Sequence, residues 1–280
     1  MKLCTFVAPG KDPRDARPGV LRGDTVTRLD AADLIEYLAH GCTASEAESH
    51  PLDQVRLLAP IPTPPSIRDF FVFEKHVATT RARRGQSVPD FWYAEPVFYF
   101  TNPAAVVGPE ETIVYPTGTA MLDYELEVAA VIGADQRIAG FTVMNDWSAR
   151  DLQRAETSVG LGPAKGKDFA TSLGPVLVTA DEFDGASATM SARVNGVELS
   201  RGELRDMHHS WAAIRDRAAL NTRLRPGDVL GSGTVGTGCL LELDTQPWLK
   251  PGDVVELEVT GLGVLRNTVG DPARGILCLD

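Results

Sequence analysis

Cysteine is scarce in this chain of 280 residues, and its 4 copies follow no recognisable spacing. Cys4, Cys42, Cys239 and Cys278 are scattered, with no C-x-x-C pair among them. This spacing supports neither a zinc ribbon nor a disulfide framework, and it favours a reducing compartment.

Long apolar runs and excess positive charge are also missing. No stretch approaches the roughly 18 uninterrupted apolar residues of a membrane span. The start, MKLCTFVAPGKD, lacks the apolar core of a signal peptide. The formal net charge of −11 argues against nucleic acid or an acidic membrane as a partner. We therefore expect a soluble, cytoplasmic protein, and its apolar fraction of 43% is enough for a substantial core.

A proline-rich segment divides the chain. The sequence PIPTPP, residues 60–65, cannot continue a helix or a central strand. We expect a small N-terminal domain over residues 1–62 and a larger domain over residues 63–280. The larger part has many short apolar segments between Gly and Pro turns, including an Asn195-Gly196 hairpin signal. This pattern predicts a β-dominated α+β fold and not an alternating βαβ chain.

Two motifs resemble ligand-binding sites but lack the structural context that such sites require. GSGTVG, from Gly231, matches the dinucleotide pattern G-x-G-x-x-G, but the following CLLELD predicts a strand where a phosphate-binding helix is required. His208 and His209 fall in a helix-like stretch, where adjacent side chains face different directions. We expect neither a dinucleotide site nor a metal site there.

Three acids alternate in MLDYELEVAAVIG, residues 121–133, which predicts a β-strand. Asp123, Glu125 and Glu127 would share one face of the strand, roughly 7 Å apart. One interpretation is the solvent-facing side of an antiparallel sheet. The other is a site for a divalent cation, because no Lys or Arg alternates with the acids to offset their repulsion.

A further acid, Asp146, ends the apolar segment of GFTVMNDWSARD, directly before a helix-like segment. Its carboxylate could complete the coordination of a cation. It could equally cap the helix that follows. The segment alone leaves both interpretations open.

Five segments in order resemble the fumarylacetoacetate hydrolase family over roughly residues 66–272: MLDYELEVAAVIG, GFTVMNDWSARDLQ, GKDFATSLGPVLV, GDVLGSGTVG and LKPGDVVELEVTGLGVLRNTV. The resemblance implies a rolled mixed β-sheet in the larger, catalytic domain, a homodimer, and Mg²⁺ (or Ca²⁺ or Mn²⁺) as cofactor. The residues that it implies are the metal ligands Asp69, Glu125, Glu127 and Asp146, the catalytic residues His76, Glu242 and Lys167, and the substrate contacts Tyr99, Arg150, Gln153 and Thr234.

The chemistry of these residue types suits cleavage of a C–C bond in a 1,3-diketo acid. His76, partnered by Glu242, could activate water, because an imidazole titrates near neutrality and a carboxylate fixes its tautomer. Lys167 and Arg150 could stabilise an oxyanion, or could simply form ion pairs beside the acids. The cation would stabilise the enolate. We expect a metal-dependent hydrolase acting on an acylpyruvate or a fumarylacetoacetate-like keto acid.

Two alternatives stay open. A 2-oxo acid decarboxylase, dehydratase or isomerase could use the same metal site, because all of them pass through an enolate. A non-catalytic small-molecule or calcium-binding protein would need the acids but not His76, Lys167 or Arg150.

The sequence departs from the family pattern at two places. Thr157 stands where a second substrate-binding Tyr is expected, and the loop at Val235 lacks the usual Thr-Pro turn. Upstream, the basic run of Arg81, Arg83 and Arg84 predicts a solvated loop, or a lid that meets a substrate carboxylate. The aromatic stretch of residues 91–100 suits a dimer contact or a core position.

Overall fold

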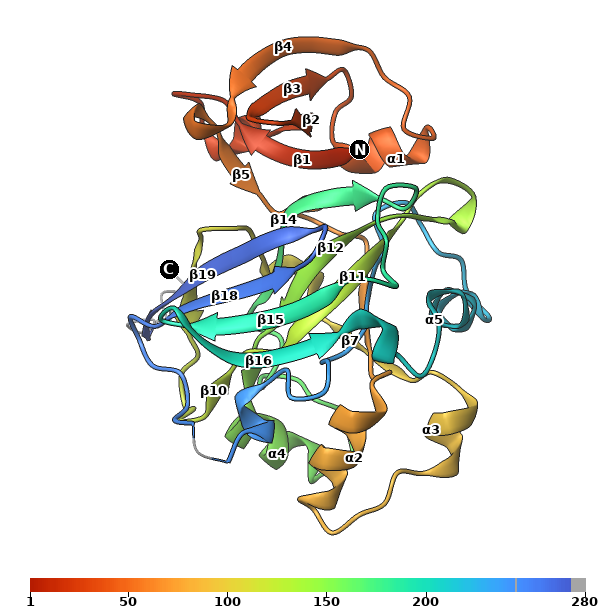
Figure 1. Cartoon of the computed structure of the whole chain (residues 1–280), viewed down its shortest axis with the longest axis vertical. Coiled ribbons are helices and arrows are strands. Elements are labelled where there is room, and N and C mark those ends of the chain that lie inside the picture. Colours follow the sequence, from red (N-terminus) through yellow and green to blue (C-terminus); the bar gives the residue numbers. More distant parts are fainter. Residues whose placement is uncertain (245, 273–280) are drawn as a thin grey trace, which may run out of the picture.

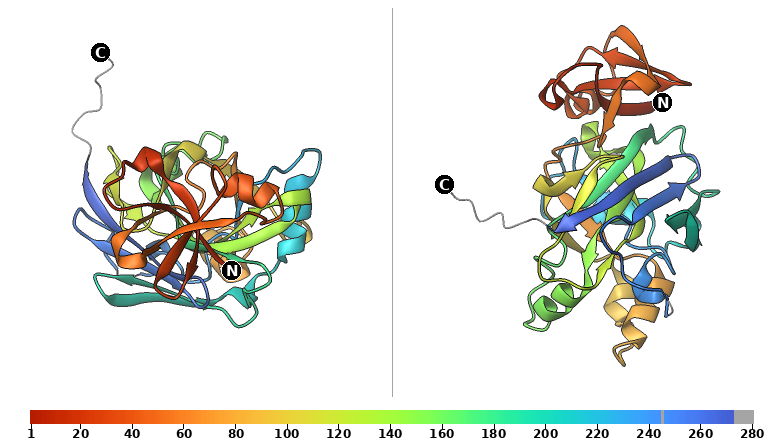
Figure 2. Two further views of the ribbon diagram at one scale, coloured as in Figure 1. Left: turned by 90° about the horizontal axis from the view of Figure 1, so that it is seen from above. Right: turned by 90° about the vertical axis from the view of Figure 1, so that its left-hand side faces the viewer.

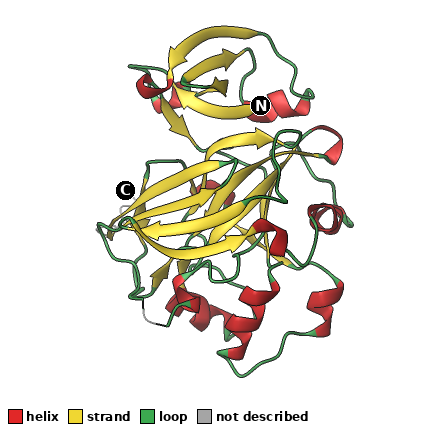
Figure 3. Ribbon diagram, in the orientation of Figure 1, coloured by secondary structure: helices red, strands yellow, loops and turns green. Residues whose placement is uncertain are grey.

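The computed structural model of the chain describes residues 1–244 and 246–272, and Cys278 lies outside that part. A small β-rich unit lies at one end of a large roll of strands, and α2, α3 and α4 lie at the opposite end (Figures 1 and 3). The helices are α1 (Leu34–Ala39), α2 (Glu74–Ala82), α3 (Asp90–Ala94), α4 (Arg150–Thr157) and α5 (Trp211–Ala219). Short 3₁₀ helices are η1 (Pro13–Asp15), η2 (Leu52–Gln54), η3 (Pro103–Ala105), η4 (Ala134–Gln136), η5 (Leu204–Asp206) and η6 (Leu240–Glu242).

The largest sheet has 12 strands in the order β4-β3-β2-β1-β14-β12-β11-β17-β6-β7, with β5 on β1 and β8 on β14. Their bounds are β1 (Lys2–Val7), β2 (Arg17–Arg22), β3 (Thr25–Leu29), β4 (Glu46–Pro51), β5 (Arg56–Leu58), β6 (Ile67–Phe70), β7 (Phe98–Thr101), β8 (Val106–Val107), β11 (Leu126–Ile132), β12 (Ile138–Asp146), β14 (Thr171–Thr179) and β17 (Val229–Gly231).

A second sheet of 5 strands has the order β16-β15-β18-β19-β9, and β10 pairs with β13 in a sheet of 2. Their bounds are β9 (Thr112–Tyr115), β10 (Leu122–Asp123), β13 (Ser148–Ala149), β15 (Thr189–Val194), β16 (Val197–Glu203), β18 (Val254–Val259) and β19 (Gly263–Pro272). Antiparallel pairs dominate, but three pairs are parallel, namely β6 with β17, β8 with β14, and β9 with β19. The predicted β-dominated α+β fold is confirmed, and the Asn195-Gly196 turn joins β15 to β16.

The N-terminal unit, β1 to β5 with α1, continues the main sheet. Strand β1 pairs with β14 only at Lys2–Val178 and Leu3–Leu177, while its pairing with β2 is longer. Both views in Figure 2 show this unit lying across one end of the roll. The division at residue 62 stays a prediction.

Strand β11 lies at the centre of the fold and is buried along its whole length. Val128 and Ala130 join one hydrophobic cluster, which also includes residues of the second sheet, and Ala129 and Val131 join another. Both clusters reach the N-terminal unit. A strand covered on both faces is a rigid support for any group placed at its end.

The predicted strand over residues 121–133 is interrupted, so β10 ends at Asp123 and β11 begins at Leu126. The N–H of Glu125 donates to the Asn145 side-chain carbonyl at 2.9 Å, so a side chain replaces a strand partner there. CLLELD, predicted as a strand, instead forms η6 and a loop. His208 and His209 precede α5, which begins at Trp211. Among the described residues, no helix is long and apolar enough to span a membrane.

Gly233 lies in the turn between β17 and η6, where the backbone leaves no room for a side chain. Gly233 has φ +79°, and a Cβ there would lie 2.4 Å from the Phe70 carbonyl oxygen, whereas Gly118 has φ +85° with nothing within 4 Å. Both Gly→Ala variants carry left-handed strain, but only Gly233→Ala adds a backbone overlap. We expect Gly233→Ala to lower the free energy of unfolding by about 1–3 kcal/mol more than Gly118→Ala, as measured by urea denaturation. Equal losses would contradict this expectation.

Candidate active site

Four carboxylates meet where β11 begins and where β6 and β12 end. One oxygen from each of Asp69, Glu125, Glu127 and Asp146 lies within 4.8 Å of the others. The sheet order brings them together, because β17 alone separates β6 from β11, and β12 pairs directly with β11. All four are buried, and Glu127 and Asp146 are 0% exposed, so the solvent-face interpretation is wrong. We call these residues the acid cluster.

The second open interpretation, a helix cap at Asp146, is also wrong. Residue Ala149 occupies the N-cap position of α4, and no side chain caps this helix. The Asp146 carboxylate instead accepts hydrogen bonds from Tyr99 Oη at 2.5 Å and from Lys167 Nζ at 2.6 Å.

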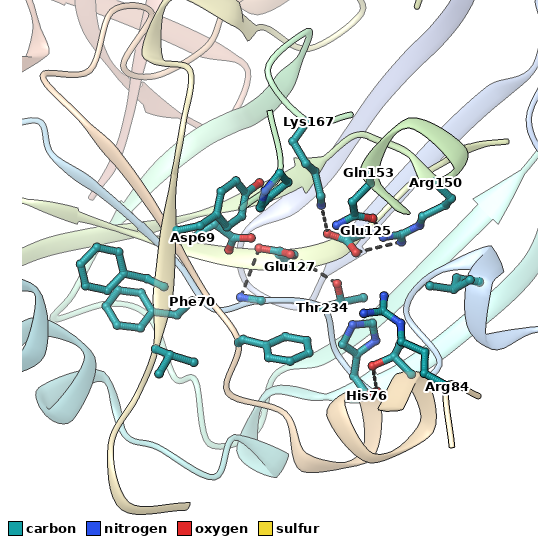
Figure 4. Close-up of a pocket in the computed structure, with 18 residues that line it drawn as sticks. Asp69, Phe70, His76, Arg84, Glu125, Glu127, Arg150, Gln153, Lys167 and Thr234 are labelled. Atoms are coloured by element: carbon teal, nitrogen blue, oxygen red, sulfur yellow. Dashed lines mark hydrogen bonds and ion pairs between the residues drawn. The ribbon is translucent and has the colours of Figure 1, made fainter. Parts of the chain in front are cut away.

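Two buried cations balance one side of the acid cluster. Lys167 Nζ lies 2.5 Å from Glu125 Oε2, and Arg150 Nη2 lies 2.8 Å from Glu125 Oε1 (Figure 4). Burial opposes ionisation of Glu125, but Lys167 and Arg150 outweigh it and hold its pKa below the ordinary value. Burial likewise opposes the charge of Lys167, but Asp146 and Glu125 raise its pKa. Both cations therefore stay charged.

The other acids of the cluster have the opposite electrostatics. Burial raises the pKa of Asp69 well above its ordinary value, and the neighbouring Asp146 adds to the effect. Burial and the nearby Asp69 do the same to the pKa of Glu127. Asp69 Oδ1 and Asp146 Oδ1 are buried without a hydrogen-bond partner among the described residues. Buried orphan carboxylate oxygens facing one another suit a hard divalent cation, so the residues present fit Mg²⁺, Ca²⁺ or Mn²⁺.

His76 and Glu242 form a buried pair from separate elements. His76 Nδ1, on α2, lies 2.8 Å from Glu242 Oε2, on η6. Glu242 also accepts the Thr237 N–H at 3.0 Å and the Cys239 thiol at 3.4 Å. Burial opposes ionisation of Glu242, but the His76 hydrogen bond outweighs it and lowers the pKa. An ionised carboxylate is thus fixed against one ring nitrogen.

One cavity of about 270 Å³ unites the predicted residues. All of them line it except Asp146, which lies behind Tyr99, and Glu242, which lies behind His76. In Figure 4, His76 approaches from the opposite side of the cavity to Lys167. Thr157 and Val235, the two departures from the family pattern, do not line it.

The predicted substrate contacts already have protein partners. Gln153 Oε1 accepts from Arg150 Nη1 at 3.2 Å, and Thr234 Oγ1 lies 3.5 Å from Glu127 Oε1. Arg150 also donates from Nε to Asp123 Oδ2 at 2.8 Å. The ion-pair interpretation of Arg150 and Lys167 therefore holds in this structure, and a role with substrate stays a prediction.

The structure also places the basic run and Asp123. Of the basic run, Arg81 donates to the Ser87 carbonyl and Arg83 pairs with Asp244, whereas Arg84 lines the cavity and has no ion pair among the described residues. The run belongs to α2 and its C-terminal end, not to a separate loop. Alternation predicts that Asp123 shares a face with Glu125 and Glu127, but it lies outside the acid cluster.

The aromatic stretch is split between core and surface. Trp92 is buried and donates from its indole N–H to the Phe71 carbonyl at 2.6 Å. Phe91 and Phe100 are 56% and 62% exposed. The homodimer stays a prediction.

Comparison with known proteins gives two family matches. The fumarylacetoacetate (FAA) hydrolase C-terminal family matches residues 67–270, and the Rv2993c-like N-terminal family matches residues 1–60. Human oxaloacetate tautomerase FAHD2A, mitochondrial, is 31% identical over 255 residues, which cover 86% of this chain and 78% of the relative. Protein Rv2993c of Mycobacterium tuberculosis is 30% identical and covers 87% of this chain and 89% of its own length.

Solved structures agree with this assignment. The 5-carboxymethyl-2-hydroxymuconate delta-isomerase of Mycobacterium smegmatis superposes with a TM-score of 0.76 at 27% identity, covering 97% of this chain and all (100%) of that one. The fumarylacetoacetate hydrolase of Exiguobacterium antarcticum gives a TM-score of 0.78 at 27% identity, covering 97% and 99%. The sequence match over most of the chain, the shared fold and the acid cluster agree, and the chain belongs to the fumarylacetoacetate hydrolase family.

Proposed function

We propose that this chain is a metal-dependent hydrolase that cleaves a C–C bond in an acylpyruvate-like 1,3-diketo acid. One observation carries the proposal: the buried His76–Glu242 pair opens onto the same cavity as the acid cluster. A water-activating base and an enolate-stabilising site are the two requirements of this reaction, and their candidate residues meet at one cavity.

His76 is arranged to act as the general base. Because Nδ1 donates to the Glu242 carboxylate, the lone pair on Nε2 is free to take a proton from water. The ionised Glu242 stabilises the resulting imidazolium. The water attacks the carbonyl carbon distal to the pyruvyl group, and the C–C bond then breaks to give a carboxylic acid and a pyruvate enolate.

Lys167, Arg150 and a divalent cation held by the acid cluster would stabilise the negative charge that develops during the reaction. Lys167 and Arg150 remain protonated, so they can stabilise an oxyanion formed in the cavity. A divalent cation held by the acid cluster would bind the oxygens of the keto acid and favour its enolate form. Protonation of the enolate carbon by the imidazolium would return His76 to its starting state.

A second candidate is keto–enol tautomerisation of a 2-oxo diacid. It is favoured by the human relative named oxaloacetate tautomerase, which is 31% identical over 86% of this chain. This reaction moves a proton between carbon and oxygen and needs no attack by water. A non-catalytic calcium-binding protein would need no His76–Glu242 pair, so we rank it last.

The His76–Glu242 pair discriminates between the two reactions. We expect His76→Asn and Glu242→Gln to lower kcat for acylpyruvate hydrolysis by about 10²–10⁴-fold, because the first removes the base and the second removes the carboxylate that orients it and stabilises its imidazolium. Loss of enol absorbance across a panel of acylpyruvates measures this. His40→Asn, at an exposed histidine on the N-terminal unit, is the control. A wild-type protein that converts enol-oxaloacetate but hydrolyses no acylpyruvate would select the tautomerase.

Neutralising one acid of the cluster should have opposite effects on the stability of the protein with and without metal. Glu127→Gln keeps the shape but removes a charge that burial disfavours, so we expect the metal-free variant to be more stable than the wild type at pH 7, by about 1 kcal/mol or more. The gain should vanish below about pH 4, where unfolded carboxyls are also protonated, should grow as pH rises from there toward the raised folded pKa, and should level off above it.

Added Mg²⁺ should reverse that order. At 100 times its Kd it should stabilise the wild type by about 2.7 kcal/mol and the variant far less. Chemical denaturation in EDTA and in MgCl₂ measures both effects, with the exposed Glu95→Gln as control. Equal Mg²⁺ stabilisation of the wild type and Glu127→Gln would remove the acid cluster from consideration as the metal site.

Arg84 is positioned to receive the carboxylate of a keto acid. It lines the cavity and has no ion pair among the described residues. We expect Arg84→Met to raise KM about 10-fold or more while kcat changes little, because a lost charge-assisted contact weakens ground-state and transition-state binding alike. Arg81→Met, at a neighbour that bonds the Ser87 carbonyl, should leave KM unchanged. A fall in kcat at constant KM would assign Arg84 a different role.

A further inference from the structure

Asp123 is a buried acid that the proposed reaction does not use. It ends β10, it is 0% exposed, and it neither belongs to the acid cluster nor lines the cavity. Burying a carboxylate is costly unless its oxygens are hydrogen-bonded. Its partners therefore indicate what the acid does.

Three donors satisfy the Asp123 carboxylate, and they come from two places. Oδ2 accepts from Arg150 Nε at 2.8 Å and from the Leu241 N–H at 3.1 Å. Oδ1 accepts from the Leu240 N–H at 2.7 Å. The side chain therefore ties α4, which begins at Arg150, to the first turn of η6.

The two elements that Asp123 contacts belong to different halves of the proposed site. Arg150 continues to Glu125 of the acid cluster, with Nη2 2.8 Å from Oε1. The helix η6 ends at Glu242, which holds His76 Nδ1 at 2.8 Å. Asp123 is therefore one hydrogen-bonded step from the acid cluster and one short helix from the His76–Glu242 pair.

We infer that Asp123 is a positioning residue that sets the His76–Glu242 pair at the correct distance from the acid cluster. The inference rests on the proposed function, because only a reaction that uses both halves at once depends on their spacing. A displacement of about 1 Å in such an arrangement can cost about 100-fold in rate. A purely structural acid would affect stability without lowering kcat selectively.

A matched pair of substitutions at Leu240 isolates this contact. Leu240→Pro deletes the N–H that donates to Asp123, and proline is tolerated at the first position of a helix. The preceding Cys239 has φ −147° and ψ 160°, in the extended region that a residue before proline favours. Leu240→Ala also shortens the side chain but keeps the N–H. Neither substitution touches the bond between Asp123 and Arg150, and Leu240 does not line the cavity.

We expect Leu240→Pro to have a kcat for acylpyruvate hydrolysis about 10- to 100-fold below that of Leu240→Ala, the usual range for a residue that orients a catalytic group. KM and the Mg²⁺ affinity measured by calorimetry should be equal in the two variants. Asp123→Asn should also lose kcat, because its amide NH₂ would face donors from Arg150 and Leu241. That variant keeps every backbone group, so it provides the same test if the proline variant does not fold.

A second measurement is independent of activity. In protein with ¹⁵N-labelled histidine rings, the His76 Nδ1–H should give a downfield proton resonance that is absent in Glu242→Gln. We expect this resonance to shift or broaden in Leu240→Pro but not in Leu240→Ala. Equal kcat in the two Leu240 variants together with an unchanged resonance would overturn the inference. If the wild type hydrolyses no diketo acid, the proposed function fails, and the resonance still decides whether Asp123 positions His76.

Discussion

Mutual repulsion among carboxylates buried at the end of a central strand is the constraint that organises this protein. Burial removes the water that would screen the acid cluster, so its charges must be neutralised locally. Lys167 and Arg150 supply part of that neutralisation from α4 and the segment that follows it. Burial raises the pKa of Asp69 and of Glu127, and neighbouring carboxylates of the acid cluster add to both shifts. The remaining imbalance is what a divalent cation would remove.

The backbone around the acid cluster is adapted to the same constraint. At Gly231 a Cβ would lie 2.5 Å from Asp69 Oδ1, so only glycine leaves room for that carboxylate. The N–H of Gly233 donates to Glu127 Oε2 at 3.2 Å, which satisfies part of its carboxylate. Gly231 and Gly233 of GSGTVG therefore lie where the chain passes close to buried acids.

Membership in the fumarylacetoacetate hydrolase family leaves the reaction open, because similar proteins are named for different reactions. Relatives of this chain carry the names of a tautomerase, an isomerase and a hydrolase. The physical difference between these reactions is whether water must be activated. In the proposed reaction this role falls to His76 and Glu242, which belong to α2 and η6 and not to the sheet. The acid cluster and the proposed water-activating pair thus lie on separate elements.

Much of this could be predicted from the sequence, because it depends on local patterns. Strand-rich periodicity, Gly and Pro turns and the order of the motifs indicated the β-dominated fold and the family. The alternation of Glu125 and Glu127 indicated a shared face, which is a property of any extended segment. The cysteine spacing argued against a zinc ribbon and a disulfide framework, and the net charge argued against nucleic acid or an acidic membrane as a partner. Neither argument depends on a contact in the fold.

The tertiary structure decided what depends on neighbours distant in sequence. The break between β10 and β11 arises from Asn145, and η6 replaces a predicted strand because Asp123 binds its first N–H groups. Alternation placed Asp123 with the other acids, but the break directs it toward Arg150 and away from the acid cluster. Which of the three acids share one site was therefore decided by long-range pairing, since a sequence pattern specifies the face of a strand but not where that strand stops.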